Sequence, residues 1–158
     1  MVERVPVTPT GLLKLRAAMK NLKEVQRPAN VQAIEEAREH GDLKENAEYH
    51  SAKEKQSMIV AQIAMVSDRL ARAQVIDPAT LDMDKIAFGA TVELLNLDTD
   101  EEVTYQIVGS EEADVASGRI AYDAPVARGM LGKEEGDEIR VKTPKGVREF
   151  EILSVEYK

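Results

Sequence analysis

The chain has 158 residues, a net charge of -8 and no cysteine. This length suits one or two small domains, and a composition of 43% hydrophobic and 32% charged residues is typical of a folded protein. The absence of Cys excludes disulfides, Cys-based zinc sites and thiol catalysis, and an aromatic content of 4% argues against a large aromatic-lined ligand pocket. The N-terminus has no apolar signal core, and the longest apolar stretch, residues 58–66, is too short to span a bilayer. We therefore expect a cytoplasmic protein.

The charge is unevenly distributed along the chain. The segment up to Ile76 carries 12 Lys and Arg against 10 Asp and Glu, whereas the segment from Asp77 onward carries 9 against 19. A protein that coats nucleic acid needs a broadly basic surface, which this composition excludes. Any contact with nucleic acid is therefore expected to be local and to lie in the first segment. The acidic second segment is explained by solubility or, as the weaker alternative, by docking on a basic protein surface.

The first segment shows helical periodicity. Thr8 followed by Pro9 predicts a helix start, because Thr can cap the first turn and Pro loses no hydrogen bond at the first helical position. An apolar stripe follows at helical spacing, formed by Leu12, Leu15, Met19 and Leu22. Pro28 removes a helical hydrogen bond and is expected to kink or interrupt the helix. The pattern then resumes, with Val31, Ile34 and Ala37.

A second helical arm follows a short turn. Gly41 is expected to end the first arm, and the second arm is expected to begin near Asp42 and to run to about Ala73. Its stripe consists of Ala52, Gln56, Ile59, Ile63, Val66, Leu70 and Ala73. Two long stripes joined by a short turn predict an antiparallel coiled-coil hairpin at residues 1–76, with its tip near residues 40–49.

Beyond Asp77 the sequence predicts two β-hairpins. The segments GATVELLNLD and EEVTYQIVGS flank a turn at residues 98–100, and DEIRVKTP and GVREFEILSVEY flank a turn at residues 144–146. Residues 125–131 lie between the hairpins and are compatible with a short helix. We expect residues 77–158 to form a mostly antiparallel sheet with a helix against it, so the predicted fold class is α+β.

The tip of the helical hairpin carries two acids, Asp42 and Glu45. Their spacing allows a purely structural interpretation, because an acid at a helix cap with Glu three residues later is a capping-box pattern. The alternative is a carboxylate pair for Mg²⁺, a cation that one or two protein carboxylates often hold together with phosphate and water. Two exposed carboxylates cannot bind Mg²⁺ tightly alone, so this alternative requires a second macromolecule that supplies the other ligands. Spacing alone favours the capping interpretation.

Basic residues flank the tip. Arg38 lies about one turn before it, Lys44 lies within it, and Lys53 lies about two turns after Glu45. These residues are either ordinary surface charge or a short track for a phosphate backbone. The two histidines, His40 and His50, have neither a Cys nor a third His nearby, which argues against a zinc site.

The tip and the second segment resemble a known family. The stretch IEEAREHGDLKENAEYHSAKE, residues 34–54, is similar to the tip signature of the Gre transcript-cleavage factors. The stretches FGATVELLNLDTDEEVTYQIVG and APVARGMLGKEEGDEIRVKTPKGVREFEI resemble the C-terminal domain of these factors, in the same order along the chain. The resemblance covers nearly the whole chain and is far more specific than a short motif. The nearly neutral hairpin resembles the GreA type, which is associated with short cleavage fragments.

The resemblance implies a fold and a mode of action. It implies a coiled-coil hairpin followed by an FKBP-like domain that docks at the rim of the secondary channel of bacterial RNA polymerase. The hairpin would enter that channel, where Asp42 and Glu45 would help to hold the second catalytic Mg²⁺ and orient a water. The polymerase itself would then cleave the displaced 3′ end of the nascent RNA in backtracked complexes, so the chain would not be an enzyme. Arg38, Lys44 and Lys53 would form the basic patch that meets the RNA.

The resemblance also implies partners and limits. The Mg²⁺ would be shared with the polymerase active site, and we expect a monomer without a membrane partner. The stretch Asp123-Ala124-Pro125-Val126 would contact the polymerase. At this point the chain departs from the family, which often has Ser before the Pro where this chain has Ala124, so the details of that contact are open.

Three other functions are compatible with parts of the sequence. A Gre-like regulator could enter the channel and inhibit without cleavage, but relatives of that kind have altered or additional tip acids, whereas GDLKENAEY is intact here. A coiled-coil adaptor would use the tip acids only as caps, and Asp42→Asn would then leave its activity unchanged. A prolyl isomerase is suggested by the FKBP-like fold, but Phe88 and Phe150 are the only Phe residues, which argues against an aromatic isomerase pocket.

Overall fold

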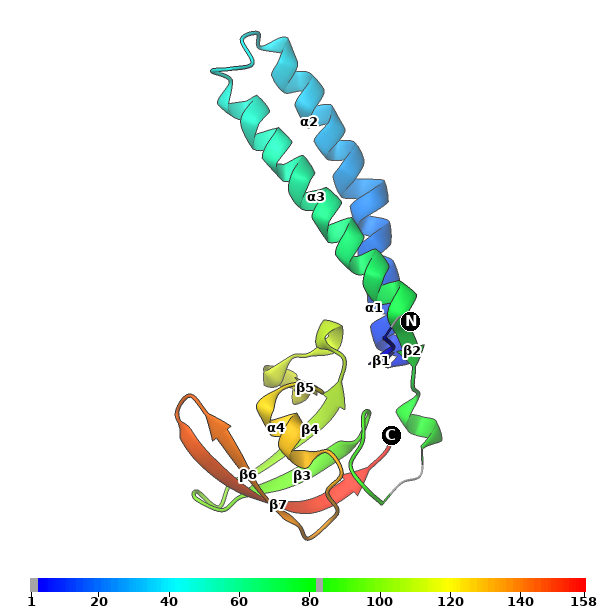
Figure 1. Ribbon diagram of the computed structural model, residues 1–158, viewed down its shortest axis with the longest axis vertical. Coiled ribbons are helices and arrows are strands. Elements are labelled where there is room, and N and C mark those ends of the chain that lie inside the picture. Colours follow the sequence, from blue (N-terminus) through cyan, green and yellow to red (C-terminus); the bar gives the residue numbers. More distant parts are fainter. Residues whose placement is uncertain (1–2, 82–83) are drawn as a thin grey trace. The chain divides into compact units, whose positions relative to one another are not determined.

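The computed structural model describes residues 3–81 and 84–158, and the chain forms two compact units (Figure 1). The hairpin unit consists mainly of Leu13–Ala73. The C-terminal unit contains Gln74–Lys158 together with Arg4–Leu12. Residues 4–12 therefore group with the C-terminal unit, although the sequence placed them in the segment 1–76. The predicted α+β fold class is confirmed, because helices dominate the hairpin unit and a sheet dominates the C-terminal unit.

The first arm of the hairpin is a continuous helical rod made of α1 (Pro9–Asn21), η1 (Leu22–Gln26) and α2 (Arg27–Glu39). The predicted start is confirmed, because the backbone N–H of Gly11 donates to Thr8 Oγ1 at 3.0 Å and so caps the first turn of α1. Leu15 and Leu22 of the predicted stripe are buried, and Leu12 and Met19 are half-buried.

Pro28 interrupts the α-helix through a wider turn. The segment η1 is a π-helix, in which the backbone N–H of Arg27 donates to the carbonyl of Leu22. Pro28 has no N–H to offer the preceding turn, and its ring crowds that turn. A wider turn gives the ring more room, although it cannot replace the missing donor. The π turn also realigns the stripe. The interval from Leu22 to Ile34 would place these side chains about 120° apart around a regular α-helix, and one extra residue in the turn reduces this to about 20°.

The residues that face the second arm after the π turn are Asn30, Ile34 and Ala37, which are all buried. The prediction that Val31 belongs to the buried stripe was wrong. Its side chain is 45% exposed, whereas that of Asn30 is 4% exposed. Asn30 satisfies its buried amide by donating from Nδ2 to the carbonyl of Ala52 on the other arm at 3.0 Å. A simple apolar stripe misassigns this position because the π turn shifts the face of the helix by about one residue.

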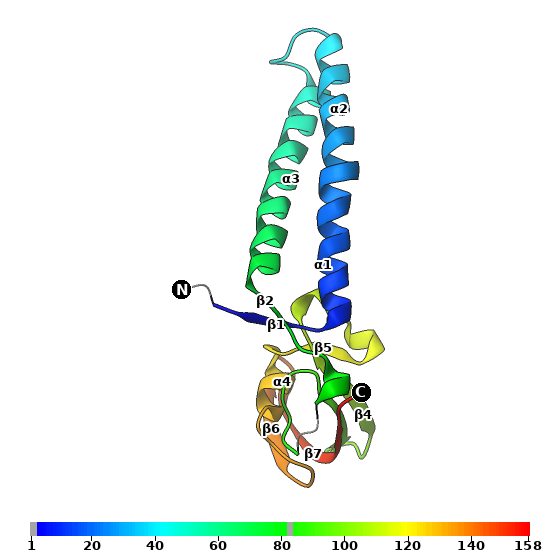
Figure 2. The same ribbon diagram turned by 90° about the vertical axis from the view of Figure 1, so that its right-hand side faces the viewer.

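The second arm is the helix α3 (Ala47–Arg72), which runs antiparallel to the first arm in both views (Figures 1 and 2). Its 26 residues give it a length of about 39 Å. The predicted stripe is confirmed: Ala52, Ile59 and Val66 are buried, and Gln56, Ile63, Leu70 and Ala73 are half-buried. The predicted antiparallel hairpin is thus confirmed. Among the described residues, no helix is long and apolar enough to cross a membrane.

The C-terminal unit contains a five-stranded sheet with the strand order β5-β4-β3-β7-β6. Its strands are β3 (Thr91–Asn96), β4 (Glu102–Val108), β5 (Arg119–Ala121), β6 (Glu138–Thr143) and β7 (Gly146–Glu156). The pairs β3–β4, β3–β7 and β6–β7 are antiparallel, which confirms both predicted hairpins, and β5 pairs parallel to β4. The pair formed by β1 (Val5–Val7) and β2 (Ala73–Val75) was not predicted.

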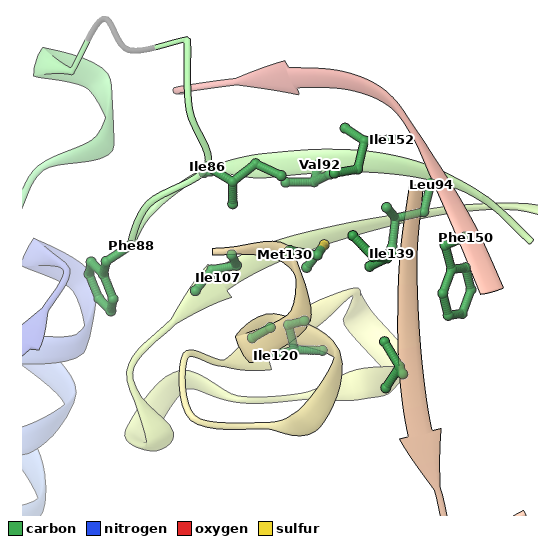
Figure 3. Close-up of a cluster of buried hydrophobic side chains, with 13 residues drawn as sticks. Ile86, Phe88, Val92, Leu94, Ile107, Ile120, Met130, Ile139, Phe150 and Ile152 are labelled. Atoms are coloured by element: carbon green, nitrogen blue, oxygen red, sulfur yellow. The ribbon is translucent and has the colours of Figure 1, made fainter. Parts of the chain in front are cut away.

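One face of this sheet carries the core (Figure 3). The short helix α4 (Pro125–Met130), which was predicted, supplies Ala127 and Met130 to that core, both fully buried. The other members of the core are Ile86, Phe88, Ala90, Val92, Leu94, Ile107, Ile120, Ile139, Val141, Phe150 and Ile152. The remaining helical turns are η2 (Pro78–Thr80), η3 (Ser110–Glu112) and η4 (Val115–Ser117).

A buried polar contact joins the start of α1 to η3 within the C-terminal unit. The hydroxyl of Thr8 donates to Glu112 Oε2, and these two side chains are 5% and 4% exposed. The same hydroxyl oxygen accepts the Gly11 N–H, so Thr8 both caps α1 and satisfies a buried carboxylate. This contact explains why the first residues of α1 belong to the C-terminal unit.

Candidate functional site

The tip is an irregular loop between the two arms. The helix α2 ends at Glu39, His40 forms its C-cap, and α3 begins at Ala47. The prediction that the second arm begins near Asp42 was therefore wrong by about one helical turn. The capping-box interpretation of Asp42 and Glu45 was wrong for the same reason, because both acids precede the helix.

Asn46 is the residue that caps α3. Its Oδ1 accepts the N–H of Tyr49 at 3.1 Å, which satisfies a donor at the start of the helix. Its Nδ2 donates to the carbonyl of Ala37 in the last turn of α2 at 2.6 Å. One amide side chain therefore joins the end of the first arm to the start of the second, which no carboxylate could do because a carboxylate only accepts hydrogen bonds.

Gly41 allows the chain to leave the first arm. Its φ of 100° lies in the region that favours glycine, and its N–H donates to the carbonyl of Arg38 at 3.2 Å. The predicted end of the first arm is confirmed. A side-chain contact also connects the two arms across the loop: His40 Nε2 lies 3.4 Å from Glu48 Oε2 in the first turn of α3.

The two acids that the sequence singled out are both exposed on this loop. Asp42 Oδ1 accepts the N–H of Lys44 at 3.1 Å, a local turn that orients the carboxylate. Asp42 and Glu45 line one open hollow of about 440 Å³, together with His40, Asn46, Ala47 and Glu48. The loop thus brings the two carboxylates to one concave surface without burying them.

The residue types in this hollow suit Mg²⁺, because hard oxygen ligands are what that cation prefers. Asp42 and Glu45 are free of the ion pair that engages Glu48. Within residues 3–81 and 84–158, however, no three His, Asp or Glu side chains come together in a group that could hold a metal. The oxygens of Asp42 and Glu45 thus form a donor pair of the type that Mg²⁺ prefers.

The predicted basic residues lie on both sides of the tip. Arg38 is exposed in the last turn of α2, and Lys44 is exposed within the loop. Lys53 is exposed on α3, where its Nζ donates to Gln56 Oε1 at 2.9 Å. All three are accessible to an anionic partner, and the structure does not bring them into contact with one another.

Comparison with known proteins identifies the family. Residues 5–75 match the family described as transcription elongation factor, N-terminal, and residues 81–157 match transcription elongation factor, GreA/GreB, C-term. The chain is 53% identical over 157 residues to the transcription elongation factor GreA of Hyphomonas neptunium, a match that covers 99% of this chain and 100% of the relative. It is 54% identical over 156 residues to the transcription elongation factor GreA of Caulobacter vibrioides (strain NA1000 / CB15N), with 99% of each chain covered.

The chain belongs to the GreA/GreB family of transcription elongation factors.

Within this family the full-length relatives are of the GreA type, which confirms the resemblance seen in the sequence. A solved structure, GreA factor homolog 1 (Gfh1) of Thermus thermophilus, is 26% identical and covers 98% of this chain and 99% of its own. Its TM-score of 0.45 is too low to add an argument. The sequence matches, not this structural likeness, establish the family.

The stretch Asp123–Val126 of this GreA-type factor lies at the start of α4. Asp123 and Pro125 are exposed, whereas Ala124 and Val126 are half-buried and pack against the core. Ala124 is the N-cap of α4 and provides no side-chain hydrogen bond there. A Ser at this position could supply that bond.

The sequence did not single out Asn46, and it led us to assess His50 only as a zinc ligand. The signal for Asn46 was available, because Asn is among the preferred N-cap residues and the helical stripe begins only after it. His50 lies in the first turn of α3, and its Nε2 is 3.0 Å from the carbonyl of Lys44 in the loop. That contact depends on the path of the loop, which spacing along the sequence does not reveal.

Proposed function

We propose that this GreA-type elongation factor stimulates the RNA cleavage activity of bacterial RNA polymerase in backtracked complexes. The factor enters the secondary channel tip first, and the polymerase removes the displaced 3′ end of the nascent RNA so that elongation can resume. The chain is not itself a nuclease, acts as a monomer and works in the bacterial cytoplasm. The observation that carries this proposal is the pair of exposed carboxylates, Asp42 and Glu45, on the tip loop of a GreA/GreB-family hairpin.

The geometry of the tip supports the sharing of a cation. Asp42 and Glu45 offer oxygens on one open hollow, and the remaining ligands would come from the polymerase and the RNA phosphate. A second metal ion in such a centre activates water and stabilises the charge that develops during phosphodiester hydrolysis. The chain contributes two negative charges, which favour the binding of that cation, and acceptor oxygens that can orient a water.

The loop orients the carboxylate of Asp42 and anchors the backbone next to Glu45. Asp42 Oδ1 is held by the N–H of Lys44, and Asn46 ties the end of the loop to α2. A ligand held in this way loses little conformational freedom when it engages a cation, which makes the interaction more favourable. This is the contribution that a stiff hairpin can make and a disordered acidic segment cannot.

The other predicted residues complete the proposed contacts. Arg38, Lys44 and Lys53 are exposed around the tip and would contact phosphates of the displaced RNA. Asp123, Ala124, Pro125 and Val126 would contact the rim of the channel, with Asp123 and Pro125 as the more accessible pair. Because the chain carries a net charge of -8, these basic contacts are expected to be local.

The decisive experiment uses stalled, backtracked polymerase complexes with end-labelled RNA. Purified factor and Mg²⁺ should shorten the RNA, whereas factor without polymerase should not. Asp42→Asn and Glu45→Gln keep the shape of each side chain and remove its charge, and either should reduce cleavage to the level without factor. Glu39→Gln, which removes the same charge from the last residue of α2 outside the hollow, is the matched control and should leave cleavage intact.

Binding must be measured in the same experiment. The Asp42→Asn and Glu45→Gln proteins should still bind the polymerase, as seen by competition with the labelled wild-type factor. Undiminished cleavage by the double variant would refute the shared-cation mechanism. If the wild-type factor bound but only inhibited cleavage, the factor would instead be an inhibitor that occupies the channel.

A further inference from the structure

The loop that carries Asp42 and Glu45 is tied to α3 by a histidine. His50 is exposed in the first turn of α3, and its Nε2 lies 3.0 Å from the backbone carbonyl of Lys44. A carbonyl oxygen can only accept a hydrogen bond, so Nε2 must carry the hydrogen. Both the neutral Nε2–H tautomer and the imidazolium meet this condition, and the contact therefore does not depend on the charge of the ring.

This contact acts on the peptide group that leads into Glu45. The carbonyl of Lys44 and the nitrogen of Glu45 belong to one planar peptide group, so a bond to this carbonyl restrains the orientation of the whole group. On the other side of Glu45, the side chain of Asn46 bonds to Ala37 and to the N–H of Tyr49. Glu45 thus lies between two anchored points, one provided by His50 and one by Asn46.

We propose that His50 is a positioning residue that holds Glu45 in the orientation needed for transcript cleavage. The inference rests on the proposed function, because it assigns a role relative to the carboxylate that this function uses. His50 does not touch the hollow lined by Asp42 and Glu45, so it acts through the loop backbone rather than on the substrate.

The surroundings of His50 favour positioning over a role in packing. The ring is exposed, and it meets Tyr49 edge-on with the ring centroids 5.8 Å apart. An exposed ring contributes little to the folded state through burial. The other histidine, His40, pairs with Glu48 across the turn, so the two imidazoles have different partners and do not form a common metal site.

The expected size of the effect follows from comparable arrangements. Groups that orient a metal ligand typically change affinity or activity by about 10- to 100-fold when they are removed. The loop keeps its Asn46 anchor in a His50 variant, so we expect the lower end of that range, roughly 10-fold. The loss should appear in the cleavage rate at saturating factor, because the basic residues and the C-terminal unit that would bind the polymerase are unchanged.

The experiment compares His50→Leu with His50→Gln in the backtracked-complex assay. Leu removes the donor, whereas the amide of Gln can place an N–H at a similar reach and restore the bond to Lys44. His50→Leu should lower the saturating cleavage rate roughly 10-fold without changing the factor concentration that gives half of that rate. His50→Gln should recover most of the rate. Ser51→Ala, at the exposed neighbouring position, should behave as wild type.

A second measurement does not rely on cleavage. Nitrogen-15 NMR of the free factor should show His50 as the Nε2–H tautomer when the ring is neutral. The amide signals of residues 43–46 should show increased fast motion in His50→Leu and near wild-type motion in His50→Gln. An Nδ1–H tautomer, or a loop whose motion is the same in all three proteins, would overturn the contact itself.

The outcomes separate this inference from the proposed function. Failure of the wild-type factor to stimulate cleavage, or full activity of the Asp42→Asn and Glu45→Gln proteins, would refute the proposed function. If those variants are inactive but His50→Leu cleaves at the wild-type rate, only the positioning role is overturned. Equal impairment of His50→Leu and His50→Gln would also overturn it, because restoring the donor would then have no effect.

Discussion

In the C-terminal unit, Val92, Leu94 and Ile107 are fully buried in one cluster, whereas at the hairpin tip Asp42 and Glu45 are exposed on a loop. The first group stabilises the fold through the apolar surface that it removes from water. The second group removes almost no surface and is held through backbone contacts. Stability and proposed function therefore depend on different residues in this chain, and a single substitution should affect one without the other.

The largest effect on stability is expected for Leu94→Ala. Leu94 is 0% exposed in the core beneath α4, so the substitution should lower the free energy of unfolding by about 2–5 kcal/mol. Glu45→Gln should change it by no more than about 0.5 kcal/mol. Urea unfolding followed by tyrosine fluorescence reports on the C-terminal unit, because Tyr105, Tyr122 and Tyr157 pack against its core. Circular dichroism at the helical minimum, recorded on the same samples, reports on the hairpin unit that contains Glu45. Similar midpoint shifts for the two variants would show that the tip acids contribute to stability as much as the core does.

A smaller loss of stability is expected where the two arms of the hairpin pack against each other. Asn30→Ala removes the bond from Asn30 Nδ2 to the carbonyl of Ala52 and should cost about 1–2 kcal/mol. Val31→Ala is the matched control, since it shortens an exposed side chain and Ala has the higher helix propensity. Thermal unfolding followed by circular dichroism at the helical minimum measures both. A larger loss for Val31→Ala than for Asn30→Ala would show that Val31 rather than Asn30 faces α3.

Much of the architecture could be predicted from the sequence because it depends on regular patterns. The stripes of Leu15, Leu22, Ile59 and Val66 identify the buried faces of the two arms, and alternation with turn residues identifies both β-hairpins. The errors lie where a local irregularity of the helix or a contact distant in the sequence decides the outcome. The face of α2 depends on the π turn, and the pairing of β1 with β2 and of β5 with β4 depends on short strands with little pattern of their own.

At the tip, too, the sequence identified some residues and missed the roles of others. Asp42 and Glu45 could be selected because the resemblance covers their surroundings, although spacing alone favoured a capping role that the structure excludes. The start of α3 is decided by Asn46, whose amide bonds to both arms at once, and residue propensities near the turn cannot reveal such a bridge. From the sequence, His50 was assessed only as a metal ligand, because its contact with the Lys44 carbonyl depends on the path of the loop.

The smallest effect is expected at the start of α4. Ala124 is its N-cap and makes no side-chain hydrogen bond, so Ala124→Ser should stabilise the C-terminal unit by about 0.5–1 kcal/mol. The urea midpoint followed by tyrosine fluorescence should rise, and Ala116→Ser at an exposed position should leave it nearly unchanged. Destabilisation by Ala124→Ser would indicate that packing of the Ala124 methyl group outweighs the gain of a cap.

The π turn at Leu22–Gln26 has a consequence for how the first arm can change in length. Because one surplus residue sets the angular phase of everything between it and the tip, losing or gaining a single residue there would rotate the distal half of the arm by about 100°. Asn30 and Ile34 would then leave the face that packs against α3, and the loop with its acids would turn with them. Length variation in this arm is therefore restricted to steps close to whole helical turns. The register in which the two arms pack thus sets the direction in which the tip loop points.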